Sequence, residues 1–196
     1  MDILQYLDMG LFGFGKSKID KRKEDWIIEA KNWYDQGNSL AKLGKDEETI
    51  VCYSQAIRLN PEDLRAWSNK GFALNKLERY EEAIRCYNQV IRSNSKDHNA
   101  WFSRGNALAS LRKYEESIAC YDKALSLDSE DLRALFNKGN ALANLKKFEE
   151  SIECFDKVIK KNPEYPSALR YKGVALKKLG RDEEAEYCFT KDKESE

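Results

Sequence analysis

The chain has 196 residues, and its 34 lysines and arginines balance its 34 aspartates and glutamates, so its formal net charge is zero. A protein that binds duplex nucleic acid needs clustered positive charge, and this balance argues against that class of partner. No stretch of the sequence approaches the ~18 consecutive apolar residues of a membrane-spanning helix. We therefore expect neither a nucleic-acid partner nor a membrane span.

Residues 1–29 are expected to form an N-terminal leader, made of an apolar arm, a charged linker and the start of the first helix. The arm lacks the basic start and the small-residue cleavage site of a signal peptide. One interpretation is that it caps the first repeat of the chain, but an arm in the groove, a partner-binding arm or an interfacial membrane anchor stays open. Its apolar residues are Ile3, Leu4, Leu7, Leu11, Phe12 and Phe14.

Residues 10–17 read GLFGFGKS and match the pattern of a phosphate-binding loop. Such a loop needs a strand before it and a helix after it, so that backbone N–H groups converge on the phosphates. Only residues 1–9 precede the motif, and the helical pattern downstream provides no parallel sheet for a strand to join. We therefore expect no nucleotide and no other cofactor.

From residue 30 onward the sequence repeats with a period of 34, which indicates stacked copies of one small unit. Numbered from 1 to 34, each unit has apolar residues at positions 4, 8, 11 and 14, and the second and third units show a second set at 20, 21, 24, 27 and 28. Both sets have helical spacing, and the short connection between them predicts an antiparallel hairpin. The predicted units are 30–63, 64–97, 98–131, 132–165 and 166–196, the last truncated and ending in polar residues.

Position 8 is glycine in every unit, although glycine inside a helix costs about 1 kcal/mol relative to alanine. Position 20, expected to face it across the hairpin, is always a small residue such as Ser117. We therefore expect the two helices to approach closely there, so that Gly105→Leu destabilises the array. The glycines are Gly37, Gly71, Gly105, Gly139 and Gly173.

The titratable residues recur in phase and do not converge into a reactive site. An acidic pair such as Glu81-Glu82 lies in the first turn of each predicted second helix. There its negative charge interacts favourably with the exposed N–H groups and stabilises the helix by about 0.3–1 kcal/mol. One histidine, His98, cannot build a nucleophile–base–orienter arrangement with cysteines placed one per repeat. We expect no catalytic residues and no metal ligands.

The five cysteines occupy position 23 of every unit. Equivalent helices in a stack lie about 8–10 Å apart, beyond the roughly 7 Å that a disulfide spans between Cα atoms. We therefore expect small buried thiols and a reducing, cytoplasmic compartment. The residues are Cys52, Cys86, Cys120, Cys154 and Cys188.

From residue 30 to about 192 the sequence resembles the tetratricopeptide repeat (TPR), whose signature places Trp, Gly, Ala, Tyr and Pro at fixed offsets. Trp67, Gly71, Ala83, Tyr87 and Pro61 match it. The resemblance implies an all-α fold, a right-handed superhelical α-solenoid of about five antiparallel helix–turn–helix repeats. It also implies a non-enzymatic scaffold or adaptor that binds a peptide or protein segment in its concave groove.

The resemblance places first-helix positions 2, 5, 6, 9, 12 and 13 on the concave side. Two asparagine pairs recur there, and an amide can hold a peptide backbone through both its donors and its acceptor. The aromatic residues suggest a partner with apolar anchors, although each could instead pack between neighbouring units. The candidate groove residues are Tyr34, Asn38, Asn69, Phe72, Phe102, Asn106, Phe136, Asn137 and Tyr171.

Three further hypotheses stay open. The position-7 cations could form a solvated edge or could bind an acidic partner segment. They are Lys70, Arg104, Lys138 and Lys172. A receptor for chaperone tails is disfavoured, because Tyr34 and Phe102 stand where that carboxylate clamp needs lysine. Self-association through the ends or through the N-terminal arm is the third, since Tyr187 and Phe189 remain apolar in the otherwise polar last unit.

Overall fold

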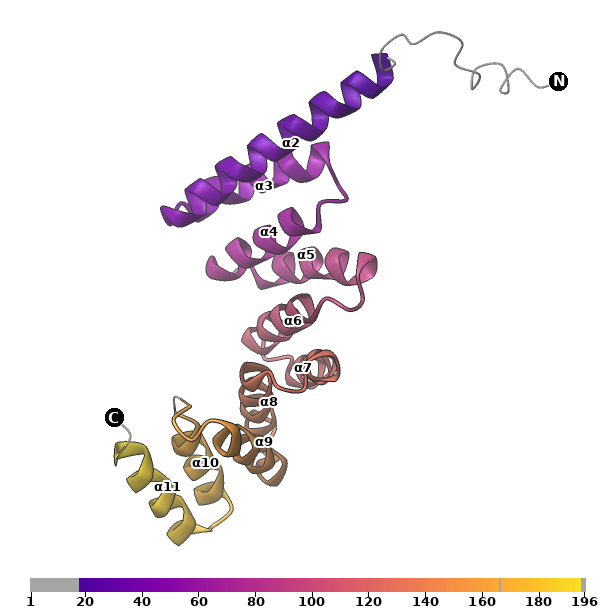
Figure 1. Cartoon of the computed structure of the whole chain (residues 1–196). Coiled ribbons are helices and arrows are strands. Elements are labelled where there is room, and N and C mark those ends of the chain that lie inside the picture. The colour runs from indigo at the N-terminus through magenta and orange to yellow at the C-terminus, as the bar shows by residue number, and fades with distance from the viewer. Residues whose placement is uncertain (1–17, 166, 195–196) are drawn as a thin grey trace, which may run out of the picture.

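The computed structural model describes residues 18–165 and 167–194, with side chains from residue 25 onward. The described chain is all-α and forms five consecutive antiparallel hairpins, as predicted (Figure 1). The helices are α2 (Lys18–Lys42), α3 (Asp46–Leu59), α4 (Leu64–Lys76), α5 (Tyr80–Ser93), α6 (His98–Ser110), α7 (Tyr114–Leu127), α8 (Leu132–Asn144), α9 (Phe148–Lys161), α10 (Ala168–Lys178) and α11 (Asp182–Glu194).

The first helix is longer than the repeat pattern suggests. Helix α2 begins at Lys18, so much of the stretch expected to be a charged linker is helical. In Figure 1 its N-terminal part extends beyond the end of its partner α3. The apolar arm and the motif at residues 10–17 lie outside the described residues.

Each hairpin closes through the same turn, because position 15 takes the left-handed conformation, with φ between 59° and 74°. The amide of the next residue then donates a hydrogen bond to the carbonyl of the leucine at position 11. In the third repeat, Lys113 N donates to Leu108 O at 2.9 Å. This is the hydrogen bond of a helix end closed by a left-handed residue. The position-15 residues are Gly44, Glu78, Arg112, Lys146 and Gly180.

Successive repeats are joined by a second recurring turn. The carboxylate of Asp97 accepts a hydrogen bond from Ala100 N at 2.8 Å and caps α6. The indole Nε1 of Trp101 donates to Ser95 O at 3.0 Å and ties the turn to the helix that follows. Because a cap satisfies N–H groups that lack a partner within the helix, this turn sets where α4, α6 and α8 begin.

The close approach within each hairpin is confirmed, but an aromatic ring explains the invariant glycine. A Cβ atom on Gly105 would lie 2.6 Å from Cε1 of Tyr121, nearer than such atoms can pack. The small residue Ser117 faces the same glycine and donates from Oγ to Gly105 O at 2.9 Å. Equivalent rings cover the other glycines: Tyr53, Tyr87, Phe155 and Phe189.

The cysteines are all buried and free, as predicted. They lie in equivalent places on α3, α5, α7, α9 and α11. Burial raises the pKa of the Cys86 thiol to about 11 and raises the pKa values of the other four as well. Because the thiolate is the reactive form, these thiols act as small apolar groups in the core.

The hairpins stack into a curved array with two layers (Figure 1). Helices α4, α6, α8 and α10 each contact the next member of that series, so the first helices form a continuous inner layer. The second helices lie on the outer, convex side. Among the helices described here, none is both long enough and apolar enough to cross a membrane.

Candidate functional site

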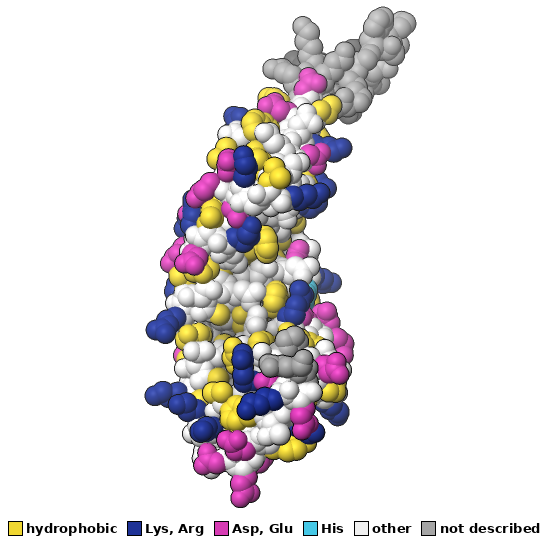
Figure 2. All heavy atoms as spheres, turned by 90° about the vertical axis from the view of Figure 1, so that its left-hand side faces the viewer, with side chains coloured by type: hydrophobic (Ala, Val, Ile, Leu, Met, Phe, Trp, Pro, Cys, Tyr) yellow, Lys and Arg dark blue, Asp and Glu magenta, His cyan; other side chains and the backbone are white. Residues whose placement is uncertain are grey.

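The inner layer is hollowed where neighbouring first helices meet, on the face that Figure 2 presents. Three open hollows lie between α2 and α4, between α6 and α8, and between α8 and α10, with volumes of about 320, 390 and 570 Å³. The middle of this face is mainly white and yellow, which marks polar uncharged and hydrophobic groups. The hollows together form the candidate groove.

The hollow between α6 and α8 contains a hydrogen-bonded amide cluster. The hydroxyl of Tyr121 and Nδ2 of Asn137 both donate to Oδ1 of Asn106, each at 2.8 Å. An amide oxygen has two lone pairs, so this acceptor is fully used. Burial raises the pKa of Tyr121 to about 12, which keeps its hydroxyl protonated as a donor. The predicted Asn106/Asn137 pair therefore links two repeats by a hydrogen bond. The other side-chain amide atoms of both residues remain at the groove.

The hollow between α2 and α4 repeats this cluster two repeats earlier in the chain. The hydroxyl of Tyr53 donates to Oδ1 of Asn38 at 2.8 Å, and Nδ2 of Asn69 lies 3.3 Å from the same oxygen. The hydroxyl of Tyr34 accepts a further bond from Asn69 Nδ2 at 3.1 Å. Both predicted asparagine pairs are thus bonded across a repeat junction.

The hollow between α8 and α10 lacks the cluster. Asn140 takes the place of Asn106, but its neighbour on the second helix is Phe155, which has no hydroxyl, and Tyr171 replaces the second asparagine. The Oδ1 atom of Asn140 is buried and has no hydrogen-bond partner among the described residues. A buried acceptor without a hydrogen bond costs about 1–3 kcal/mol. The junction between α8 and α10 therefore gains less from side-chain hydrogen bonds than the other two junctions do.

Three of the predicted aromatic residues pack against a ring on the second helix of their own repeat. Tyr34, Phe102 and Phe136 are half-buried, and their ring centroids lie 5.7, 6.1 and 5.6 Å from second-helix rings. Arginine side chains cover two of them: Arg65 lies 5.0 Å from the Tyr34 centroid, and Arg133 lies 4.9 Å from that of Phe102. These rings present little free surface to a partner.

Two predicted aromatic residues remain open on the groove. Phe72 is 64% exposed and lines the hollow between α2 and α4, while Tyr171 is 40% exposed and lines the hollow between α8 and α10. Beside Tyr171 lies Val174, 48% exposed, which was not among the predicted groove residues. It occupies position 9, the same position as Phe72, which the sequence register had already placed on the concave side.

Two of the position-7 cations form ion pairs between repeats. Nζ of Lys138 lies 2.5 Å from Oδ1 of Asp122, and Nζ of Lys172 lies 2.5 Å from Oδ1 of Asp156. Each acid belongs to the second helix of the preceding repeat, and neither lysine lines any of the three hollows described above. Both lysines are therefore already paired within the chain, and the hypothesis that the position-7 stripe binds an acidic partner stays a prediction.

The single histidine of the chain lies beside an aspartate at the junction between the third and fourth repeats. Nε2 of His98 lies 3.0 Å from Oδ2 of Asp131, the residue that caps α8. Burial opposes ionisation of that carboxyl, but hydrogen bonds from the side chain and backbone of Arg133 hold the pKa of Asp131 below its usual value. In the part of the chain that the structure describes, no group of three or more His, Cys, Asp or Glu residues could hold a metal ion.

Three family models match this chain. Two tetratricopeptide repeat models match residues 73–131 and 132–165, and a TPR repeat model matches residues 37–78. With the stacked hairpins, they define a helical repeat protein with a concave wall. The chain belongs to the tetratricopeptide repeat family.

Solved structures share the same fold. A crystal structure of MamA is 18% identical, covers 85% of this chain and 91% of its own, and superposes with a TM-score of 0.81. MamA 41-end from Desulfovibrio magneticus RS-1 is 21% identical, with coverages of 85% and 94% and a TM-score of 0.82. YrrB, described as a TPR protein with an unusual peptide-binding site, is 21% identical, with coverages of 92% and 93% and a TM-score of 0.76. A comparison with curated protein sequences found no significant match.

Proposed function

We propose that this protein is a non-enzymatic scaffold or adaptor that binds a peptide or protein segment in the groove lined by α2, α4, α6, α8 and α10. The observation that carries the proposal is the exposure of Phe72 and Tyr171 inside hollows of the inner wall. Buried aromatic anchors dominate the energy of many interfaces, and open rings in a concavity suit that role. Similarity of fold to YrrB, described as having a peptide-binding site, is consistent with this use.

The groove supplies polar contacts beside these anchors. Nδ2 of Asn106 and Oδ1 of Asn137 take part in no hydrogen bond within the described chain, so both can serve a ligand backbone. Tyr34, Phe102 and Phe136 stabilise the inner wall by packing against rings of the second helices. Free buried thiols with raised pKa values are consistent with a reducing compartment, and we propose a cytoplasmic location on that basis.

The test is capture of partners from native cell extract by the tagged chain, compared among surface variants. Phe72→Ala and Tyr171→Ala remove the open rings of the groove. We expect the recovered partner to fall several-fold, because truncation of an interface anchor commonly costs about 2 kcal/mol or more. The control is Val51→Ala on the outer helix α3, where the side chain is 57% exposed. Equal capture by all variants would exclude the groove as the binding surface.

Self-assembly is a second candidate function, favoured by apolar surface at the two ends of the array. Trp26, Ile27 and Ile28 are 53%, 57% and 59% exposed on α2, and Tyr187 is 64% exposed on α11. Consecutive exposed apolar residues mark a contact surface. Sedimentation over a range of concentrations tests it. We expect the apparent molecular mass of the original chain to rise with concentration, and that of the Ile27→Glu variant to stay lower. A monomer at every concentration would rule it out.

A further inference from the structure

We propose that the groove's partner is an acidic polypeptide segment with one large apolar side chain, and that this side chain binds in the hollow between α8 and α10. The inference rests on the proposed groove function and specifies the chemistry of the ligand. Its basis is the separation of charge between the two helix layers and the set of cations that have no ion pair.

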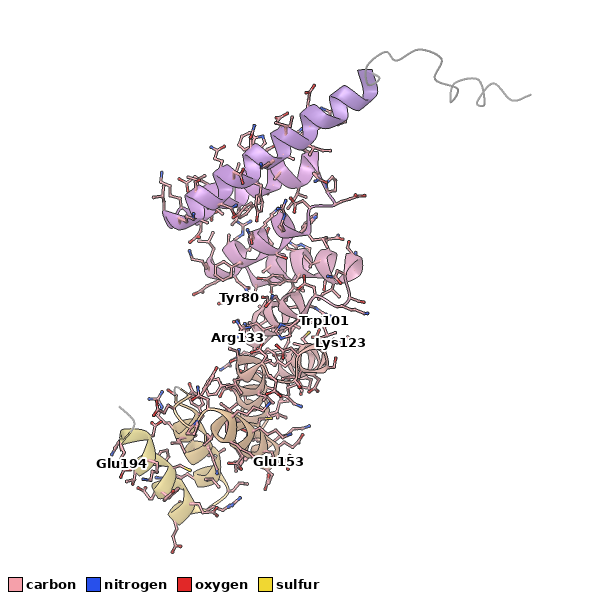
Figure 3. The ribbon with its side chains drawn as sticks, in the orientation of Figure 1. Tyr80, Trp101, Lys123, Arg133, Glu153 and Glu194 are labelled. Atoms are coloured by element: carbon pink, nitrogen blue, oxygen red, sulfur yellow. The ribbon has the colours of Figure 1, made fainter. Side chains whose placement is uncertain are left out.

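From α4 onward the inner layer carries positive charge although the whole chain is neutral, whereas α2 contains both acidic and basic residues. Helices α4, α6, α8 and α10 contain no aspartate or glutamate, whereas the second helices α3, α5, α7, α9 and α11 all begin with acidic first turns. In Figure 3, Arg133 lies on the concave side, and Lys123 and Glu153 lie on the convex side. The inner-layer cations are Arg65, Lys70, Lys76, Arg104, Arg133, Lys138, Arg170, Lys172, Lys177 and Lys178.

Several of these cations already have acidic partners within the chain. Arg65 and Arg133 bond the capping aspartates, and Lys76 pairs with Asp46 at 2.7 Å. In contrast, Lys178 on α10 forms no ion pair with any described residue, and neither does Lys146 in the turn between α8 and α9; both line the hollow between α8 and α10. An acid on a ligand can therefore contact them without displacing an existing pair.

The same hollow provides the apolar surface for an anchor. Tyr171, Val174 and Phe148 line it, together with Ala143 and Ala175. At about 570 Å³ it is the most voluminous of the three hollows described above, with room for a large side chain. An apolar group bound there would lie beside Lys146 and Lys178, so acidic residues next to the anchor in the ligand sequence would reach them.

The adjoining wall is suited to the ligand backbone. The hollow between α6 and α8 shares Asn140 and Asn144 with the anchor hollow, and no charged side chain lines it. Amides bind main-chain groups without regard to the ligand sequence. An extended segment anchored between α8 and α10 would continue across these amides toward α6. Specificity then resides in the apolar anchor and its acidic neighbours.

The test uses short fluorescent peptides of defined composition. One peptide carries a phenylalanine flanked by glutamates on both sides. Its relatives replace the glutamates by glutamines, the glutamates by lysines, or the phenylalanine by alanine. A single-stranded RNA oligonucleotide is a further anionic probe. We expect the glutamate–phenylalanine peptide to bind about tenfold or more tightly than each relative at low ionic strength, and to weaken as salt increases.

Variants of the chain locate the site. Lys146→Glu combined with Lys178→Glu should weaken binding of the acidic peptide about tenfold, and Tyr171→Ala should weaken it by a similar factor. The control combines Lys123→Glu with Lys157→Glu. These exposed lysines lie on the outer helices α7 and α9, so the control changes the net charge equally without altering the groove. Circular dichroism establishes that each variant is folded.

The remaining outcomes separate this inference from the function on which it rests. Equal or tighter binding of the glutamine or lysine peptide, still sensitive to Tyr171→Ala, would preserve groove binding and overturn the acidic partner. Tighter binding of the oligonucleotide, lost in the Lys146→Glu and Lys178→Glu variant, would identify a nucleic acid and also overturn the inference. If no peptide selected from a random display library required either Phe72 or Tyr171, the proposed function would fail as well.

Discussion

At Gly105, helix propensity and packing make opposite demands on one residue. Alanine is favoured over glycine by about 1 kcal/mol inside a helix, so local energetics alone would replace it. The ring of Tyr121 occupies the space that a Cβ atom would need, with a separation of only 2.6 Å. The recurrence of glycine at position 8 was evident in the sequence, but the identity of the group above it required the fold.

We predict that Gly105→Ala lowers the free energy of unfolding by about 1–3 kcal/mol, because the ring must shift within a packed hairpin. Urea denaturation measures the change. Gly180→Ala is the matched control, since its Cβ would meet nothing within 4 Å but its φ is +74°. That variant should lose about 1 kcal/mol through backbone strain alone. A more stable Gly105→Ala protein would contradict the packing explanation.

The buried thiol of Cys86 predicts a loss of stability in alkaline solution. Its pKa is raised from 9.0 to about 11 in the folded chain, so the folded state favours the neutral thiol. The contribution of this thiol to the free energy of unfolding is fully present below pH 9 and is lost as pH rises from 9 toward 11. The total loss should be about 2–3 kcal/mol.

Chemical denaturation across that pH range measures the loss, and Cys86→Ala should make it smaller. The pKa values of the other cysteines and of Tyr87 are also raised by burial, so part of the loss should persist in the variant. Identical pH profiles for the variant and the original chain would show that Cys86 does not contribute.

At the scale of elements, α6 and α8 have closely similar sequences but different surroundings. Asn106 on α6 accepts from Tyr121 and Asn137, whereas the equivalent Asn140 on α8 has an unpartnered Oδ1. The difference arises from residues outside these two helices: Phe155 replaces the tyrosine, and Tyr171 replaces the second asparagine. The hydrogen bonds of a first helix in this array therefore depend both on the second helix of its own repeat and on the first helix of the repeat that follows.

We predict that Asn106→Ala costs about 1–3 kcal/mol of unfolding free energy, because the buried hydroxyl of Tyr121 loses its acceptor. Asn140→Ala removes an acceptor that has no partner and should cost clearly less. Thermal or urea denaturation of both variants gives the comparison. Equal losses would mean that the cluster between α6 and α8 adds nothing to the junction.

At the scale of the whole molecule, each hairpin contacts only its neighbours, as expected of a repeat array. Among the described residues, the hairpin of α6 and α7 is packed on both sides, whereas that of α10 and α11 packs on one side only, against α8 and α9. Stability should therefore vary along the chain even though every repeat has the same internal packing. Partner binding at α8 and α10 would involve this less protected end.

We predict that backbone amides of α10 and α11 exchange with solvent fastest and those of α6 and α7 slowest among the described hairpins from α4 to α11. Local opening of an end repeat breaks one interface, and opening of an inner repeat breaks two. Hydrogen exchange followed by mass spectrometry measures the order. Uniform protection over these four hairpins would indicate a single cooperative unit.

The linear sequence was sufficient for the architecture of this protein. The period of 34, the helical spacing of apolar residues and the recurring glycine, leucine and cysteine positions determined the hairpins, their antiparallel pairing and the buried thiols. These features depend on contacts within one repeat or between identical neighbours, which a periodic pattern records directly. The family resemblance was likewise carried by residues inside single repeats.

Only the tertiary structure decided how the inner wall is used. Tyr34, Phe102 and Phe136 pack under neighbouring groups, while Phe72 and Tyr171 stay open. The tertiary contacts likewise determine that Lys138 is paired, whereas Lys146 and Lys178 have no ion pair within the described residues. The physical reason is that exposure and pairing on this wall depend on groups from the adjacent repeat, brought together by the stacking and curvature of the hairpins.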